Sequence, residues 1–122
     1  MGRCWLGIIG QTAIYHSGPV WERVAIDALQ DPAVPVKIDA VKSLSQYGSR
    51  AAKPAIFDAF RYWRDWWKDR GEQNEESRRL EQTFVEATTH PKSWTPDDRD
   101  LSTIRDLCLT ESCKSQVPPH YD

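Results

Sequence analysis

The sequence predicts an all-α fold built from stacked helical units, and three observations support this class. The pattern Leu-x-x-Ile-Gly-x-x-Ala, which begins at Leu6, returns 38 residues later as Leu-x-x-Tyr-Gly-x-x-Ala from Leu44. Elsewhere, apolar residues recur every three or four positions, which is typical of one face of a helix. No stretch alternates convincingly between apolar and polar residues, so we expect essentially no sheet. A repeated helix end, turn and helix start indicates that like units stack along the chain.

Glycine and proline positions define the first two elements. Residues 3–9 predict the last turns of a helix that ends at Gly10, which can adopt the left-handed C-cap conformation. The next helix is expected over about residues 19–29, with Ser17 as a candidate N-cap and Pro19 in the first turn. Its apolar residues form one broad stripe that consists of Val20, Trp21, Val24, Ala25, Ala28 and Leu29.

The dipeptide Asp31-Pro32 separates this helix from the next. Asp31 can cap free backbone N–H groups, and Pro32 is tolerated at the first helical position. Gly48 is expected to end this third helix, and Lys37 and Lys42 are expected on its solvent face. Its buried face is predicted to consist of Val34, Ile38, Val41 and Leu44.

A long, unusually apolar helix is expected over residues 51–70. One stripe runs along Ile56, Phe60, Trp63 and Trp67, and three further aromatic residues widen it, namely Phe57, Tyr62 and Trp66. A helix with so wide an apolar face is predicted to contact neighbours on two sides.

Two further helices are expected after the polar connection 71–75. The first covers residues 76–89 and ends at His90-Pro91, because a residue before proline avoids the helical region. Its inward residues are Leu80, Phe84 and Ala87, and its outward residues are Arg78, Arg79, Glu81 and Glu86. The second begins at Thr95-Pro96-Asp97-Asp98, with Thr95 as hydroxyl cap, and buries Leu101, Ile104, Leu107 and Cys108. Residues 112–122 are expected to form a disordered tail, which leaves one helical-repeat domain over residues 1–111.

The middle of the chain resembles the HEAT repeat, in the variant seen in phycobilin-lyase-like proteins. The resemblance covers about residues 25–60, with a weaker partial unit over 6–29, and does not continue after Gly71. It depends on Asp31, Val36-Lys37, Ala40, Leu44, Gly48, Ala51 and Pro54-Ala55-Ile56, with Lys37 where the family usually has arginine. The resemblance implies a HEAT-like α-solenoid fragment of about three helical hairpins with an atypical C-terminal cap. Because residues 1–10 match only the second half of a unit, we expect either a fragment of a longer solenoid or a homodimer that covers this end.

Composition limits the class of partner and the compartment. The net charge of −2 argues against a general polyanion-binding protein, which usually has a marked basic excess. Nothing approaches the run of about 20 apolar residues that crosses a bilayer, so no membrane partner is expected. Three cysteines without a tight pairing pattern make a disulfide framework unexpected. Without a convincing secretory signal, the cytoplasm is the default localisation.

No catalytic or metal site is predicted, and no cofactor. Cys108, Cys113 and His120 offer three metal ligands at most, whereas structural zinc normally needs four with tighter spacing. His16 and His90 lie in predicted turns without a nucleophile motif beside them. Paired acids such as Asp97-Asp98 are explained as helix starts. Nothing in the sequence therefore points to an enzyme.

The most suggestive surface lies on the long helix, where basic and aromatic residues interleave. The candidate binding residues are Arg61, Trp63, Arg64, Trp66 and Lys68. Our preferred hypothesis is a non-catalytic protein-interaction or scaffold module, because Trp, Tyr and Arg are enriched in interface hot spots. The alternative is a nucleic-acid-binding repeat that uses the same helix, since aromatic side chains can stack on bases. The structural interpretation is that the tryptophans pack internally while the basic residues form a solvated face with Asp65 and Asp69.

Overall fold

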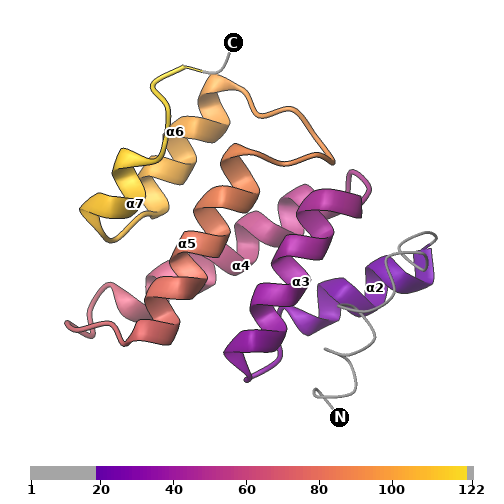
Figure 1. Cartoon of the computed structure of the whole chain (residues 1–122), viewed down its shortest axis with the longest axis horizontal. Coiled ribbons are helices and arrows are strands. Elements are labelled where there is room, and N and C mark those ends of the chain that lie inside the picture. The colour runs from indigo at the N-terminus through magenta and orange to yellow at the C-terminus, as the bar shows by residue number, and fades with distance from the viewer. Residues whose placement is uncertain (1–18, 121–122) are drawn as a thin grey trace.

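The computed structural model describes residues 19–120, which form six helices and no strand (Figure 1). The helices are α2 (Pro19–Ala28), α3 (Val34–Tyr47), α4 (Ala52–Trp67), α5 (Glu75–Thr89), α6 (Asp98–Leu107) and α7 (Glu111–Ser115). The all-α prediction is therefore confirmed for this part of the chain. The predicted helix end at residues 3–9, Gly10, Ser17 and the first copy of the repeated pattern lie outside the described residues.

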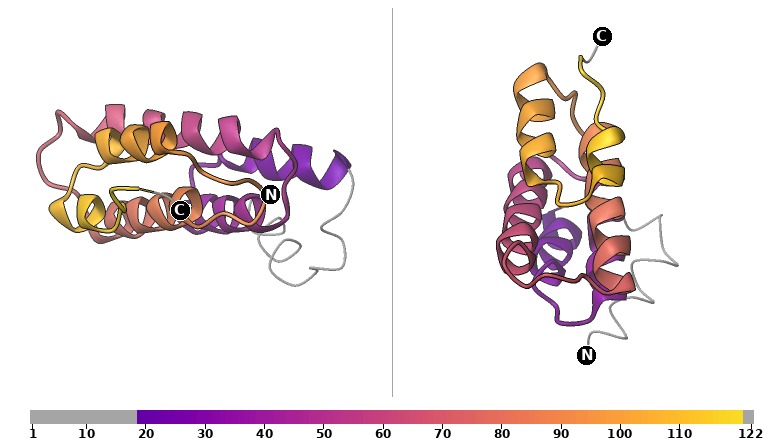
Figure 2. Two further views of the ribbon diagram at one scale, coloured as in Figure 1. Left: turned by 90° about the horizontal axis from the view of Figure 1, so that it is seen from above. Right: turned by 90° about the vertical axis from the view of Figure 1, so that its left-hand side faces the viewer.

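The helices form two layers (Figure 2). One layer contains α2, α4 and α6, and the other contains α3, α5 and α7. Contacts run both between successive helices and between alternate helices of one layer, such as α3 with α5 and α4 with α6. The core lies between the layers, where the largest fully buried side chains include Leu44, Ile56, Phe60, Phe84 and Ile104.

The apolar face of α4 joins the two layers. Ile56 and Phe60 are fully buried, and the Phe60 ring stacks on Phe84 of α5 with 4.9 Å between centroids. The prediction that this helix contacts neighbours on two sides is confirmed, because α4 packs against α2, α3, α5 and α6. Its aromatic face is nevertheless wider than its neighbours cover, and Tyr62 and Trp66 remain exposed.

Two predicted helix starts are wrong in detail. The N-cap of α3 is Ala33, and the Asp31 carboxyl accepts a hydrogen bond from the Ala33 N–H (2.8 Å), which forms a local turn before the helix. The N-cap of α6 is Asp97 rather than Thr95, because Asp97 and Asp100 accept hydrogen bonds from each other's backbone N–H. The Asp97 carboxyl accepts a hydrogen bond from the Asp100 N–H, and this bond is the main reason why the pKa of Asp97 lies below its usual value.

Gly48 ends α3, as predicted, but the requirement for glycine is steric. Its φ of −72° is accessible to any residue. A Cβ at this position would lie 2.5 Å from the Ala52 Cβ and 2.6 Å from the Leu44 carbonyl oxygen. The close approach of α4 to the end of α3 therefore depends on the absence of a side chain at Gly48.

The same turn is also tied to α2. The carboxyl of Glu22 accepts hydrogen bonds from the backbone N–H and the hydroxyl of Ser49.

The predicted apolar stripe of α2 is only partly buried. Ala25, Ala28 and Leu29 are buried, whereas Val20 is 77% exposed and Val24 is 37% exposed. Among the described helices, α3 and α4 are the main neighbours of α2, and they cover one side of it. The apolar stripe of α2 is thus wider than the surface that α3 and α4 cover, and Val20 and Val24 lie outside the covered part.

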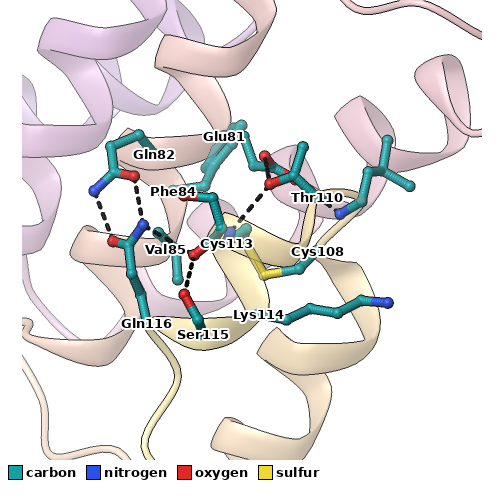
Figure 3. The surroundings of a disulfide bond; sticks show 12 residues. Glu81, Gln82, Phe84, Val85, Cys108, Thr110, Cys113, Lys114, Ser115 and Gln116 are labelled. Carbon is teal, nitrogen blue, oxygen red and sulfur yellow. Dashed lines mark hydrogen bonds between the residues drawn. A yellow bond between two sulfur atoms is a disulfide. The ribbon is translucent and has the colours of Figure 1, made fainter.

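The C-terminal segment differs from the expected disordered tail. Residues 111–115 form α7, and Val117 is 6% exposed. Cys108 and Cys113, which we expected to remain unpaired, form a disulfide that joins the end of α6 to α7 (Figure 3). These two thiols, considered above as metal ligands, are thus bonded to each other. The amides of Gln82 and Gln116 also exchange two hydrogen bonds of 2.7 Å between α5 and α7.

Glu81 was predicted to face solvent but is 3% exposed. Its carboxyl accepts hydrogen bonds from the backbone N–H of Leu109 (2.7 Å) and Thr110 (3.2 Å) and from the Thr110 hydroxyl (2.7 Å), as Figure 3 shows in part. The Thr110 hydroxyl in turn accepts from the Cys113 N–H and caps α7. The prediction failed because the α6–α7 turn covers a second side of α5, which the periodicity of one helix cannot reveal.

Within residues 19–120, no helix combines the length and apolar character that crossing a bilayer requires.

Candidate functional site

A pocket of about 270 Å³ opens among helices α2, α3, α4 and α5. It lies between the end of α2, the first turns of α3, the middle and end of α4 and the start of α5. Its apolar wall consists of Leu29, Val34, Ala59, Tyr62, Trp63, Trp66, Trp67, Leu80 and Phe84. Its polar wall consists of Gln30, Lys37, Asn74 and Ser77.

Trp63 is fixed within this wall by its neighbours. Its side chain is 5% exposed, and the indole N–H donates a hydrogen bond to the Ser77 hydroxyl (3.0 Å). That hydroxyl donates to the side-chain oxygen of Gln73 (3.2 Å). The ring also lies against Phe60 and Phe84, with centroid distances of 5.9 and 6.4 Å. A wall held by both packing and hydrogen bonds is preorganised, which reduces the ordering cost of binding.

The mouth of the pocket is aromatic and exposed. Tyr62 is 60% exposed and Trp66 is 47% exposed. The Arg70 guanidinium lies 3.6 Å from the centroid of the Trp66 ring, and its Nε–H donates to the Trp66 carbonyl (2.8 Å). Gly71 follows with a φ of +79°, which lets the chain turn away directly after Arg70. One face of Trp66 is therefore covered by a cation, and the indole remains available at the pocket mouth.

The five candidate residues from the sequence divide into two groups. Trp63 and Trp66 line the pocket, although Trp63 is buried rather than displayed. The three basic residues do not line it, and each lies near an aspartate of α4. Arg61 is 3.2 Å from Asp58, and Asp65 lies 3.3 Å from Arg64 and 3.8 Å from Lys68.

Sequence reasoning missed the part of the pocket that comes from α3 and the preceding turn. Lys37 was assigned to solvent, yet it is half-buried and lines the pocket with Val34 and Leu29. Asn74 and Ser77 were also missed. The unusual width of the aromatic face on α4 was the available signal, because it indicated apolar surface in excess of what a core needs. Nothing in the sequence showed that the α2–α3 turn lies beside it.

The pocket is mainly apolar, and its lining carries a few polar groups. Its described lining contains no His, Cys, Asp or Glu side chain. Across residues 19–120, no group of three or more such side chains could hold a metal ion. The pocket instead combines aromatic surface with a lysine and two amide side chains, which suits an apolar group that carries a hydrogen-bond acceptor.

Comparison with known proteins identifies no relative: no family model and no curated protein matches the chain, and no solved structure matches it either.

Proposed function

We propose that this protein is a non-catalytic protein-interaction module, whose pocket between the first two hairpins takes an apolar side chain of a partner. The pocket is the single observation that carries this proposal. It has a rigid aromatic wall, and its surface continues outward over Tyr62 and Trp66. Exposed tryptophan and tyrosine beside a pocket are typical of interface hot spots. A ligand that fills the pocket and also contacts both exposed rings extends beyond it, as a protein segment does.

The scaffold we propose is a short HEAT-like α-solenoid. The two-layer arrangement supports it, because hairpins α2–α3, α4–α5 and α6–α7 each contribute one helix to each layer. In this proposal the disulfide-linked third hairpin serves as the cap. Val20 and Val24 are exposed at the α2 end, where a further unit or a second copy would add. Mass measurement in solution tests the homodimer, and a monomer at micromolar concentration contradicts it.

Nucleic-acid binding by α4 has weaker support. Arg61, Arg64 and Lys68 each lie within 4 Å of an aspartate, so much of their charge is already balanced. Fluorescence anisotropy with labelled single-stranded and duplex DNA tests this alternative. Binding that weakens steeply with salt and is lost in an Arg61→Glu, Arg64→Glu variant supports it over our proposal.

The disulfide bears on the expected compartment. Disulfides persist in oxidising environments and are rare in the cytosol. The Cys108–Cys113 bond therefore favours an oxidising compartment over the cytoplasmic default. Alkylation of the protein in freshly lysed cells, followed by mass spectrometry, reports the state of both thiols.

Selection from a random peptide library tests the proposed function, because such a selection does not require the natural partner. Displayed 12-residue peptides are selected on the full chain and then measured individually by fluorescence anisotropy. We expect enriched peptides that share a bulky apolar residue. Their affinity falls about thirtyfold for Trp66→Ala, which corresponds to a hot-spot contribution of about 2 kcal/mol.

The matched control is Tyr47→Ala. Tyr47 is an exposed aromatic residue (42%) at the far end of α3 and does not line the pocket. We expect its substitution to leave peptide affinity unchanged. If no peptide is enriched, or if enriched peptides bind the Trp66→Ala variant as well as they bind the wild-type protein, the proposed function is wrong.

A further inference from the structure

Lys37 lines the pocket and has no counter-charge among the described lining residues. It lies in the first turns of α3 and is half-buried. None of the ion pairs in the described part of the chain involves it. The residues three and four positions away on its own helix face are Ala33, Val34, Ala40 and Val41, none of which is acidic. Its charge is thus not balanced along α3.

The described residues around the pocket do not supply the missing charge either. The described pocket lining contains no Asp or Glu, and residues 1–18 contain none in the sequence. The cations on the outer face of α4 are different, since each of them lies near Asp58 or Asp65. Arg70, at the pocket mouth, is held against the Trp66 ring and carbonyl. Lys37 is therefore the cation of the described pocket lining that can pair with a group from another molecule.

The neighbouring polar groups also present hydrogen-bond donors. The Oδ1 atom of Asn74 already accepts from the Ser77 N–H (2.7 Å), so its amide NH₂ is the free end. The side-chain amide of Gln30 makes no hydrogen bond within residues 19–120. A lysine and two amides in one pocket lining favour a carboxylate, because charge-assisted hydrogen bonds are stronger than neutral ones.

The volume of the pocket limits the apolar part of the ligand. A cavity of about 150 Å³ can hold benzene, and pockets for drug-sized ligands begin at about 300 Å³. At about 270 Å³, this pocket fits one large side chain.

We propose that the pocket recognises an acidic anchor motif, in which a bulky apolar side chain of a partner protein enters the pocket and an adjacent Asp or Glu pairs with Lys37. This inference rests on the proposed function and specifies the partner's chemistry. The aromatic wall supplies affinity through apolar burial, and Lys37 selects among apolar anchors by charge.

The test repeats the peptide selection on three full-length proteins: wild type, Lys37→Met and Lys37→Glu. On the wild type, we expect Asp or Glu to be enriched within two positions of the apolar anchor. On Lys37→Met, which keeps the apolar stem, this acidic preference disappears. On Lys37→Glu, it changes to a preference for Lys or Arg.

The matched control is Lys42→Met, because Lys42 is an exposed lysine on the same helix that does not line this pocket. Its selected peptides should keep the acidic preference. A second measurement changes the peptide and compares its binding to the wild type and to Lys37→Met. Replacing the selected Asp with Asn should weaken binding to the wild type about three- to tenfold, as expected for a partly buried ion pair, and should leave binding to Lys37→Met unchanged.

The outcomes separate this inference from the proposed function. Peptides that depend on Trp66 but show no acidic preference overturn the role of Lys37 and leave the protein-binding proposal standing. If no peptide depends on Trp66, both fail. An acidic preference that survives in Lys37→Met also overturns the inference.

Discussion

Replacing Glu81 with alanine tests how the C-terminal hairpin is attached to α5. The carboxyl is 3% exposed and accepts three hydrogen bonds from Leu109 and Thr110. Each such hydrogen bond contributes about 1–2 kcal/mol, and a buried donor left without a partner costs about 1–3 kcal/mol. Water can reach the partly buried donors and offset some of this loss. We therefore expect Glu81→Ala to lower the free energy of unfolding by about 3–5 kcal/mol.

Two variants calibrate this expected loss. Glu81→Gln keeps the size and one acceptor oxygen, so we expect a smaller loss of about 1–2 kcal/mol. Glu86 is an exposed glutamate of the same helix, and its carboxyl accepts a hydrogen bond from the Gln82 side chain. Glu86→Ala should therefore change the free energy of unfolding by less than about 0.5 kcal/mol.

Urea unfolding, monitored by tryptophan fluorescence and circular dichroism, measures all three changes. Amide hydrogen exchange gives a local measurement, because the Leu109 and Thr110 N–H groups should be protected in the wild type and exposed to exchange in Glu81→Ala. A Glu81→Ala protein within about 1 kcal/mol of the wild type, with both amides still protected, would refute this account of the hairpin.

Further predictions concern the turns, the disulfide and one cap. Gly48→Ala should cost about 1–3 kcal/mol in urea unfolding, because its Cβ would meet fixed atoms, whereas Gly71→Ala should cost about 1 kcal/mol through its positive φ alone. Asparagine should be better tolerated at 71 than at 48, and the reverse order contradicts this explanation. Reducing the Cys108–Cys113 disulfide, whose cysteines are five positions apart, should lower the free energy of unfolding by about 2 kcal/mol, and an unchanged urea midpoint rejects it. The lowered pKa of Asp97 means that its ionised carboxylate stabilises the folded protein above pH 3.8, the ordinary pKa of the group. This stabilisation is lost as the pH falls through the lower pKa of the folded state. An NMR titration midpoint at or above 3.8 contradicts this prediction.

Local sequence patterns predicted most helices because their causes act within a few residues. Gly48 and His90-Pro91 end helices where expected. The stripe through Ile56 and Phe60 is buried as predicted. The helix starts were less accurate, since several neighbouring Asp, Thr and Pro residues can each serve as a cap.

The candidate site was predicted only in part. The aromatic excess on α4 led to Trp63 and Trp66, both of which line the pocket. It also led to Arg61, which pairs with Asp58 on its own helix. A spacing pattern identifies which residues share a helix face, but it does not show how far each side chain projects or which neighbour covers it.

The sequence by itself determined that this chain forms helices, where several of them end, and which faces are apolar, because hydrophobic periodicity and turn chemistry are local. The tertiary structure alone decided that Glu81 is buried, that Cys108 and Cys113 are joined, and that Lys37 lines a pocket. Each of these facts depends on a second segment that lies beside the residue's own helix, such as the start of α5 across the pocket from Lys37. Such packing is decided by how the helices pack against one another, and no pattern within a single helix encodes it.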